Sequence, residues 1–419
     1  MHHFCYKNGE LYAEDVPLRK IAEEVGTPCY IYSQATLTHH FNVFDRAFKN
    51  IPHLTCYSVK ANSNIALLHL FASLGGGADV VSGGELFRAL KAGVSPKKIV
   101  FSGVGKTEGE IEMALKAGIL MFNVESEAEL ETIEKIAKRL EKKAPIALRV
   151  NPDIDPKTHP YISTGLKKHK FGIEMSQAKE LYFKALKMPH LEIIGIDCHI
   201  GSQVTSLAPF LEALERIKSL WHELEKKGIK LNYLDMGGGL GIPYHEEEEP
   251  PHPTDYAKAI IEAAKDLHCT LIFEPGRVIV GNAGILLVKV LYLKKTSEKQ
   301  FVIVDGAMND LIRPSLYGAY HEIKPVIKKD NSTILADIVG PICETTDFFA
   351  RDREISSIKK GDLLAIMSAG AYGFVMSSNY NSRLRSPEVL VNGEKYWVIR
   401  RRESYEDLVR LEEIPAWLK

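Results

Sequence analysis

The stretch KIVFSGVGKTEGEIEMALKAGILMFNVES, residues 98–126, contains two apolar segments separated by a helical one. The outer segments are dense in Val, Ile, Leu and Phe, as are parallel strands that helices cover on both faces. Thr107 and Glu110 have the spacing of a capping box, which predicts where the helix begins. Gly118 fits the left-handed position that ends a helix. The stretch therefore predicts a strand–helix–strand unit of a parallel α/β fold.

This unit repeats along the chain. Ser82 with Glu85 and Ser126 with Glu129 repeat the capping-box spacing, and RALKAG repeats the helix end MALKAG. Eight strand candidates follow one another: TCYSV, GADVVS, KIVFSG, LMFNVES, PIALRVN, IIGIDCHIG, LNYLDMGGG and TLIFEPG. Eight strands with intervening helices over roughly 230 residues match an α/β fold of the (β/α)₈ TIM-barrel type. We predict this barrel, with a doubly wound open sheet as the alternative.

The two ends of the chain have a different character. After residue 284, apolar strand candidates follow one another with few helical patterns, and VNGEKYW has an Asn-Gly hairpin signal. YKNGELY and TPCYIYS near the N-terminus predict another hairpin and a strand. We therefore predict a barrel domain over residues 35–283 and an all-β domain built from residues 1–34 and 284–419.

Composition narrows the class of protein. A chain of 419 residues exceeds what one core usually holds, which predicts two domains. The formal net charge of -1 provides no electrostatic attraction to nucleic acid or to a membrane surface, so neither partner is expected. We find no signal peptide and no apolar segment of the roughly 20 residues that span a bilayer. The six cysteines are scattered without a Cys-x-x-Cys pair, which predicts free thiols in a cytoplasmic protein.

Chemically active side chains gather where the predicted strands end. The carboxyl ends of the strands surround the active site of a barrel. Lys60 follows the first strand, Asp79 lies in the second and Arg149 in the fifth. The last three strands run into CHIGS, DMGGGLG and EPGR, which contribute His199, Ser202, Gly237, Gly238, Gly239, Glu274, Gly276 and Arg277. These positions predict one site at this end of the barrel, with Asp79 and Arg149 supporting it.

Two glycine runs differ in their position. LGGGADVV precedes a strand, and we interpret it as a flexible loop at the other end of the barrel. DMGGGLG follows the seventh strand, where backbone N–H groups without side chains can surround a phosphate. Phosphate sites in this fold favour the loops after strands seven and eight. The second run therefore predicts a phosphate-binding loop, although a glycine triplet alone fits a plain tight turn equally well.

An amine, a phosphate loop, an imidazole and a carboxylate are the groups that pyridoxal phosphate uses. A lysine amine reacts with its aldehyde, and a carboxylate can keep its ring nitrogen protonated. Each residue alone has an ordinary explanation: Lys60 in a salt bridge, His199 as a partly buried histidine, Glu274 as a turn cap. Their common position favours a pyridoxal phosphate site. A metal site is the rival use of histidine and carboxylates, and we expect none.

Five segments carry a resemblance to a known family: YSVKAN, CHIGSQ, DMGGGLG, EPGR and GPICETTD. In this order and over nearly the whole chain, the sequence resembles the pyridoxal-phosphate-dependent amino acid decarboxylases with the alanine-racemase fold, and among them the diaminopimelate decarboxylases. The resemblance implies a barrel that binds pyridoxal 5'-phosphate and a β-domain built from both chain ends, in agreement with the prediction above. It also implies a homodimer whose active sites are shared between subunits.

The resemblance implies a role for each site residue. Lys60 would hold the cofactor's aldehyde, His199 would stack on its ring and Glu274 would pair with its ring nitrogen. Cys343 would be the proton donor, supplied by the other subunit. The residues that would hold the phosphate or close over it are Ser202, Gly237, Gly238, Gly239, Gly276, Arg277 and Tyr372. The residues that would bind the substrate are Arg277, Arg313, Tyr317, Glu344 and Tyr372.

The substrate-binding residues imply a substrate with a second amino acid group at its far end. An arginine matches a carboxylate, and a glutamate matches an ammonium. Ornithine, arginine and lysine lack that second group, whereas meso-2,6-diaminopimelate has it. Arg313 and Tyr317 share a face if their segment is helical with Pro314 in the first turn. The implied reaction is decarboxylation of meso-2,6-diaminopimelate to L-lysine and CO₂, the last step of bacterial lysine biosynthesis.

Other functions remain open from the sequence. Another decarboxylase of this fold would act on ornithine, arginine or carboxynorspermidine. A non-catalytic homologue that binds pyridoxal phosphate would usually lack the lysine, the cysteine or the β-domain, and this chain has all three. A racemase would usually have an arginine at the ring nitrogen, where Glu274 stands.

Overall fold

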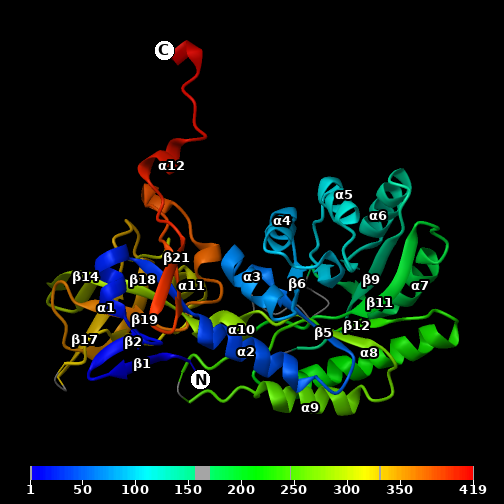
Figure 1. Ribbon diagram of the computed structural model, residues 1–419, viewed down its shortest axis with the longest axis horizontal. Helices are drawn as coiled ribbons and strands as arrows, with labels where there is room; N and C mark the ends of the chain where they lie inside the picture. Colours follow the sequence, from blue (N-terminus) through cyan, green and yellow to red (C-terminus); the bar gives the residue numbers. More distant parts are fainter. Residues whose placement is uncertain (1, 156–169, 246, 330–331, 419) are drawn as a thin grey trace. The chain divides into compact units, whose positions relative to one another are not determined.

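The computed structural model describes residues 2–155, 170–245, 247–329 and 332–418. The chain forms two compact units, each described by itself. The first, called the barrel unit below, contains residues 38–243 and 247–279. The second, called the β-unit, contains residues 1–37, 244–246 and 280–419 (Figure 1). None of the helices in the described residues combines the length and the apolar character that a membrane span requires.

In the described part of the barrel unit, eight parallel strands form a closed ring. Each of the eight predicted segments contributes one strand. Each of these strands pairs with its two neighbours, and the first pairs with the last, which confirms the closed barrel rather than the open sheet. In ring order the strands are β5 (His53–Ser58), β6 (Gly77–Val80), β7 (Ile99–Phe101), β8 (Met121–Val124), β9 (Ala144–Asn151), β11 (Leu191–Asp197), β12 (Tyr233–Asp235) and β13 (Thr270–Phe273). The short β10 (Ile173–Glu174) extends the sheet beside β9.

Helices follow the strands as the repeated unit predicts. They are α3 (Ile65–Ser73), α4 (Gly83–Lys91), α5 (Glu108–Ala117), α6 (Glu127–Arg139), α7 (Met175–Ala185), α8 (Ala208–Lys226), α9 (Pro253–Ala263) and α10 (Arg277–Val280). A further helix, α2 (Gln34–Ala47), precedes β5 and packs Phe41 and Phe44 into the core.

Of the three predicted capping boxes, the one at α5 is complete. Thr107 accepts a hydrogen bond from the Glu110 backbone, and Glu110 accepts one in return. At α4 and α6 the cap serine accepts as predicted, but the glutamate three residues on accepts from the residue before the cap instead. At α6 the other oxygen of this glutamate also forms an ion pair, since Lys106 Nζ lies 2.7 Å from Glu129 Oε1 and both side chains are buried.

The glycine run before β6 is not the flexible loop that we predicted. A Cβ atom on Gly77 would lie 2.1 Å from the Lys98 carbonyl oxygen. A Cβ on Gly76 would lie 2.7 Å from the Phe41 ring. The run therefore allows α2, β6 and the neighbouring backbone to pack closely at the amino-terminal ends of the barrel strands.

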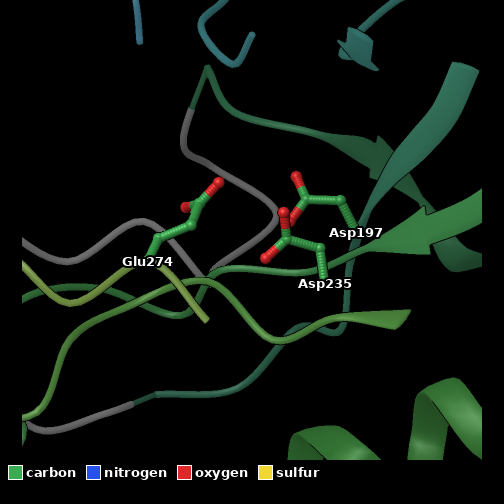
Figure 2. A group of neighbouring side chains, drawn as sticks. All are labelled: Asp197, Asp235 and Glu274. Carbon is green, nitrogen blue, oxygen red and sulfur yellow. The ribbon is translucent and has the colours of Figure 1, made fainter. Parts of the chain in front are cut away.

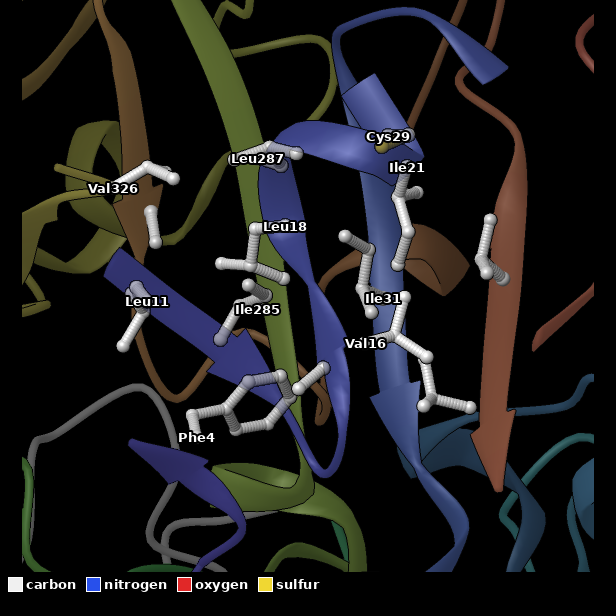
Figure 3. Packing of buried hydrophobic residues seen from close by; sticks show 14 of the residues in the cluster. Phe4, Leu11, Val16, Leu18, Ile21, Cys29, Ile31, Ile285, Leu287 and Val326 are labelled. Carbon is white, nitrogen blue, oxygen red and sulfur yellow. The ribbon is translucent and has the colours of Figure 1, made fainter. Parts of the chain in front are cut away.

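The β-unit is built from both chain ends, as predicted. Strand β4 (Cys29–Ser33), from the N-terminal part, lies between β14 (Gly284–Lys295) and β20 (Glu388–Asn392). The other strands of this sheet are β15 (Gln300–Val304), β16 (Ile323–Pro325), β17 (Thr333–Val339), β18 (Phe348–Ser356), β19 (Leu363–Ile366) and β21 (Lys395–Arg400). A three-stranded sheet consists of β1 (Phe4–Lys7), β2 (Glu10–Ala13) and β3 (Val16–Pro17). Apolar side chains from β1–β3 and from the large sheet share one core (Figure 3).

Both predicted hairpins form, but the unit is not purely β. The β1–β2 turn uses Asn8 and Gly9 at positive φ, and Gly393 in the β20–β21 turn also has a positive φ. The unit also contains α1 (Leu18–Val25), α11 (Arg313–Tyr317) and α12 (Tyr405–Val409), so it is mostly rather than entirely β. Apolar strand candidates predicted the sheet. Of these three short helices, α12 has a capping box, whereas α1 and α11 have no side-chain cap at their N-termini.

Candidate active site

The lumen of the barrel changes from apolar to polar in one step. Its lower part is a buried cluster that includes Cys56, Val100, Met121, Ala147 and Ile272. Because side chains alternate along a strand, the residue two positions further faces the same lumen. Those residues belong to a ring with one polar member from each strand or its end: Ser58, Asp79, Ser102, Asn123, Arg149, Asp197, Asp235 and Glu274. We call this ring the polar layer, and all of its members are buried.

Lys60 lies directly above the polar layer, in the 3₁₀ turn Val59–Ala61 that follows β5. Its Nζ is 2.7 Å from Asp79 Oδ2, and that oxygen also accepts a hydrogen bond of 2.9 Å from Ser58 Oγ. The Lys60 side chain is 34% exposed, so its amine is paired but accessible. The sequence placed Asp79 near this site without assigning it a contact, and the structure makes it the partner of the lysine.

Glu274 is held by residues that the sequence analysis did not single out. Ser102 Oγ donates to Glu274 Oε1 over 3.2 Å, and Asn123 Nδ2 donates to the same oxygen over 3.4 Å. Asn123 also donates to Asp235 Oδ2 over 3.1 Å. Both residues are polar side chains in otherwise apolar predicted strands, which was the signal available in the sequence.

Three carboxyl groups of the polar layer face one another (Figure 2). Oxygens of Asp197, Asp235 and Glu274 lie within 4.8 Å of one another. Burial and the neighbouring Asp235 and Asp79 raise the pKa of Glu274 well above its ordinary value. Burial and Asp197 raise the pKa of Asp235 to about 8, and burial and Glu274 raise that of Asp197. Burial and mutual repulsion therefore favour the protonated form of these three carboxyl groups.

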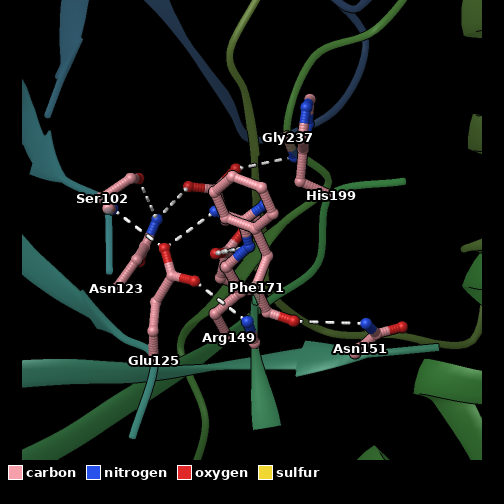
Figure 4. A network of polar contacts seen from close by, with 12 residues as sticks. Ser102, Asn123, Glu125, Arg149, Asn151, Phe171, His199 and Gly237 are labelled. Carbon is pink, nitrogen blue, oxygen red and sulfur yellow. Dashed lines mark hydrogen bonds and ion pairs between the residues drawn. The ribbon is translucent and has the colours of Figure 1, made fainter. Parts of the chain in front are cut away.

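Arg149 is the basic member of the polar layer (Figure 4). Its Nη1 lies 2.9 Å from Glu125 Oε1, its Nε lies 3.9 Å from Asp197 Oδ2, and its guanidinium lies over the Phe171 ring. Glu125 in turn accepts backbone hydrogen bonds from Gly103 and Gly172. Arg149 thus supports the upper end of the barrel, as predicted, through a glutamate that the sequence analysis missed.

The seventh-strand glycines bind His199 through the backbone. Gly238 N–H donates to His199 Nδ1 over 3.1 Å, so the proton of the neutral ring is on Nε2. Burial and the charges of Arg149 and Lys60 lower the pKa of His199 well below its ordinary value. His199 is therefore a neutral imidazole. Gly237 N–H donates to Asp235 Oδ1 over 2.9 Å, which joins the same loop to the polar layer.

This loop has no space for side chains. A Cβ atom on Gly238 would lie 2.1 Å from the Glu274 carbonyl oxygen, and one on Gly239 would lie 2.4 Å from the Gly201 carbonyl oxygen. Gly239 also has a φ of +112°. The geometry therefore requires glycine and distinguishes this run from a plain tight turn, in which only the backbone conformation matters.

The sixth and eighth strand ends meet through a side-chain contact. Arg277 begins α10, directly after the EPG segment, and is buried. Its Nη2 donates to Ser202 Oγ over 3.0 Å. Together with Gly237–Gly239, these residues gather the predicted phosphate-binding groups at one side of the barrel mouth. By the barrel mouth we mean the carboxyl ends of the strands and the polar layer below them.

The remaining predicted residues lie in the β-unit. Arg313 and Tyr317 share the five-residue helix α11 with Pro314 in its first turn, as predicted. Arg313 Nη1 lies 2.9 Å from His321 Nε2 and its guanidinium lies over the Tyr244 ring. Because arginine only donates, His321 Nε2 accepts. The structure thus fixes the orientation of a buried guanidinium.

Cys343 and Glu344 differ from Arg313 in being exposed. Cys343 N–H donates to Asn381 Oδ1 over 3.0 Å. Glu344 accepts hydrogen bonds from the Thr346 hydroxyl and, over 2.9 Å, from the Tyr380 hydroxyl; these bonds lower its pKa. Tyr372, the last predicted site residue, has a φ of +55° and is partly buried.

The family comparison decides the class of this site. Residues 34–281 match the model of the pyridoxal-dependent decarboxylase family, described as its pyridoxal binding domain. This chain belongs to the pyridoxal-dependent decarboxylases. The diaminopimelate decarboxylase of Pseudomonas aeruginosa is 54% identical over 97% of this chain and 98% of its own.

Solved structures of pyridoxal-dependent decarboxylases have the same fold. Diaminopimelate decarboxylase from M. jannaschii in complex with L-lysine superimposes with a TM-score of 0.95, is 41% identical, and covers 100% of both chains. The Helicobacter pylori enzyme, also in complex with L-lysine, has a TM-score of 0.91 and is 47% identical over 94% of this chain and 99% of its own.

The residues of the barrel mouth fit the cofactor of these decarboxylases. The glycine loop presents N–H groups where any Cβ would collide, which suits a phosphate. Burial and neighbouring carboxyl groups raise the pKa of Glu274, and a protonated ring nitrogen beside it would offset their effect. The Lys60 amine is accessible to an aldehyde.

Proposed function

We propose that this pyridoxal-dependent decarboxylase converts meso-2,6-diaminopimelate to L-lysine and CO₂. The observation that carries the proposal is identity above 50% to diaminopimelate decarboxylases over nearly the full length of both chains. The two structures solved with L-lysine, the expected product, support it. The family match over residues 34–281 supports residues 35–283 as the cofactor-binding domain, with residues 1–34 and 284–419 as the β-domain.

In the barrel mouth, residues from several strand ends would hold the cofactor. Pyridoxal phosphate supplies an aldehyde for the substrate amine and a ring that withdraws electrons from the bond to the leaving carboxyl group. Lys60 would bind the aldehyde, and Glu274 would hold the proton of the ring nitrogen. His199, kept neutral, would stack on the ring without repelling its charge. The phosphate would be held by Ser202, Gly237, Gly238, Gly239, Gly276 and Arg277, with Tyr372 closing over it.

Residues of the β-domain, together with Arg277 of the barrel, would bind the substrate at its non-reacting end. Arg277, Arg313 and Tyr317 would bind its carboxylate, with Tyr372 beside them. Glu344 would bind its ammonium, and its lowered pKa keeps it ionised for that purpose. Holding both distal groups orients the reacting carbon, which is how binding energy is used for reaction at one centre.

We further propose a cytoplasmic homodimer in which Cys343 of one subunit donates a proton in the other subunit's site. The exposure of Cys343 and Glu344 supports this, because reacting groups normally work in water-excluded sites. Free thiols on all six cysteines, every one in the described residues, suit a reducing compartment.

The decisive experiment is a CO₂-release assay on four substrates: meso-diaminopimelate, ornithine, arginine and carboxynorspermidine. We expect meso-diaminopimelate to have the highest kcat/KM by a wide margin. A preference for ornithine or arginine would reject the substrate and leave the family unaffected. Release of no CO₂ from any of them would favour a non-catalytic homologue.

Glu344→Ala tests the ammonium contact. We expect kcat/KM for diaminopimelate to fall about tenfold or more, because a charged partner is removed from the substrate. Glu394→Ala, in the exposed turn between β20 and β21, is the matched control and should leave kcat/KM unchanged. Equal values for both variants would reject the role of Glu344.

A further inference from the structure

The last part of the β-unit exposes an unusual amount of apolar surface. Residues 405–418, called the C-terminal arm, include Leu411 at 88% and Trp417 at 85% exposure. Four more large apolar side chains of the arm are over half exposed: Tyr405, Val409, Ile414 and Leu418. Apolar side chains gathered in so short a segment mark an interaction surface rather than ordinary exposed residues.

The arm is ordered by its own contacts. It begins with α12, whose cap Ser404 and Asp407 form a complete capping box. Within the described residues, every hydrogen bond of the arm stays between residues 404 and 418. Figure 1 shows α12 and the following residues projecting away from β21. The conformation of the arm therefore does not depend on a partner that covers its apolar side chains.

Glu403, two residues before the arm, is hydrogen-bonded to the segment that also holds the loop between β17 and β18, called the Cys343 loop. Glu403, next to the cap of α12, accepts from Asn379 Nδ2 over 2.7 Å and from Arg385 N–H over 2.9 Å. The same segment then holds the loop, because Asn381 accepts from Cys343 N–H. The start of the arm is thus continuous with the surface that the proposed function places against a second subunit.

We propose that the C-terminal arm packs on a second copy of this chain, at the rim of its barrel mouth. The inference rests on the proposed function in one respect, since it takes the partner's barrel mouth as the place where Cys343 acts. If the loop reaches that mouth, the arm that starts beside it meets the partner's rim. Burial of its apolar side chains there would contribute to dimer stability.

The rim has the matching chemistry. Four exposed apolar residues, which we call the rim, lie in the segments that follow β5, β6 and β7: Ile65, Val81, Phe87 and Val104. Phe87 is the most exposed of them at 56%, and Lys91 Nζ lies over its ring. The arm carries four carboxylates and one arginine among its apolar residues. An acidic apolar arm fits an apolar rim with a lysine and does not fit an anionic lipid surface.

The test is sedimentation equilibrium of the full chain with pyridoxal phosphate bound. In one variant, Leu411→Ser, Ile414→Ser and Trp417→Ser are combined. We expect its dimer dissociation constant to rise about a hundredfold or more, because central aromatic and aliphatic contacts dominate interface affinity. Leu186→Ser is the matched control: it is 55% exposed, follows α7 at the other end of the barrel, and should leave the constant unchanged.

Phe87→Ser tests whether the arm contacts the rim. Alone it should weaken the dimer, and combined with the triple variant it should weaken it no further, because both remove one contact. Additive effects of Phe87→Ser and the triple variant would reject the contact between the arm and the rim. A triple variant that dimerises like wild type, or a wild type that is monomeric at every concentration, would overturn the proposal.

The readout separates this proposal from the proposed function. Sedimentation needs no substrate, so it holds whether or not wild type releases CO₂ from diaminopimelate. Conversely, the triple variant should recover wild-type kcat once its concentration makes it fully dimeric. A kcat that stays low in the associated variant would contradict a role confined to the interface.

Discussion

The barrel mouth and the Cys343 loop differ in how they hold their reactive groups. In the barrel mouth, charged groups are buried or half-buried and hold one another through contacts within one unit, as in the Lys60–Asp79 pair and the Glu125–Arg149 pair. In the loop, Cys343 and Glu344 are exposed, and their hydrogen-bond partners include the exposed residues Asn381 and Tyr380. The charged groups of the barrel mouth are therefore positioned by contacts within one unit, whereas the Cys343 loop needs another surface to exclude water.

The first prediction tests the barrel side of this comparison and has the largest expected effect. Lys60→Ala should lower the rate of CO₂ release at least about a thousandfold, because it removes the amine proposed to bind the aldehyde. Borohydride reduction of the wild-type enzyme followed by peptide mapping should find the cofactor on Lys60. Modification of a different lysine would overturn the assignment.

The second prediction tests whether the loop serves the other subunit. Lys60→Ala and Cys343→Ala chains, each poorly active alone, are mixed and allowed to exchange. About a quarter of wild-type activity should return, since half of randomly mixed dimers are heterodimers with one intact site. Mixing either variant with itself is the control. No recovery after verified exchange would show that each site uses its own chain's cysteine.

The third prediction concerns the glycine loop of the barrel mouth. Gly238→Ala should weaken cofactor binding about a hundredfold, because its Cβ would meet the Glu274 carbonyl oxygen and displace the loop. Absorbance of the bound cofactor in a titration measures this. Gly109→Ala is the control, since that glycine lies in α5 with open space around it. Equal affinity in both variants would remove the loop from the cofactor site.

The fourth prediction, with the smallest effect, concerns the pH dependence of stability without cofactor. Asp235 has a folded pKa of about 8, raised by burial and Asp197. The folded state then keeps a proton that the unfolded state loses near its ordinary pKa, so stability falls as pH rises from about 4 to about 8. The slope approaches about 1.4 kcal/mol per pH unit for one such group. Asp235→Asn should flatten this slope in thermal unfolding measured between pH 5 and pH 8.

An exposed aspartate provides the control with opposite sign. Hydrogen bonds from Lys218, outweighing partial desolvation, and from His222 lower the pKa of Asp266 to about 2. Its stabilisation is present above the unfolded pKa and is lost as pH falls toward about 2. Asp266→Asn should therefore leave the slope between pH 5 and pH 8 unchanged. A wild-type slope that Asp235→Asn leaves unaltered would show that another group of the polar layer carries the proton.

Particular residues show how far the sequence could be interpreted. The apolar runs predicted all eight barrel strands, because a strand covered on both faces has an apolar pattern of its own. Asn123 and Ser102 were present in those runs as polar exceptions, but nothing local says that both contact Glu274 from across the lumen. Glu125 was hidden for the same reason, since its partner Arg149 is on the next strand of the ring.

The sequence by itself determined the barrel, the β-domain from both ends and the residues that gather at strand ends. Strand period, helix caps and glycine positions are local properties, and the order of motifs carries the family. Only the tertiary structure decided which carboxyl groups raise one another's pKa, which lysine contact is made and which glycines have no space for a Cβ. Those properties depend on distances across the barrel, because burial and nearby charge set a pKa, and such distances exist only once the ring has closed.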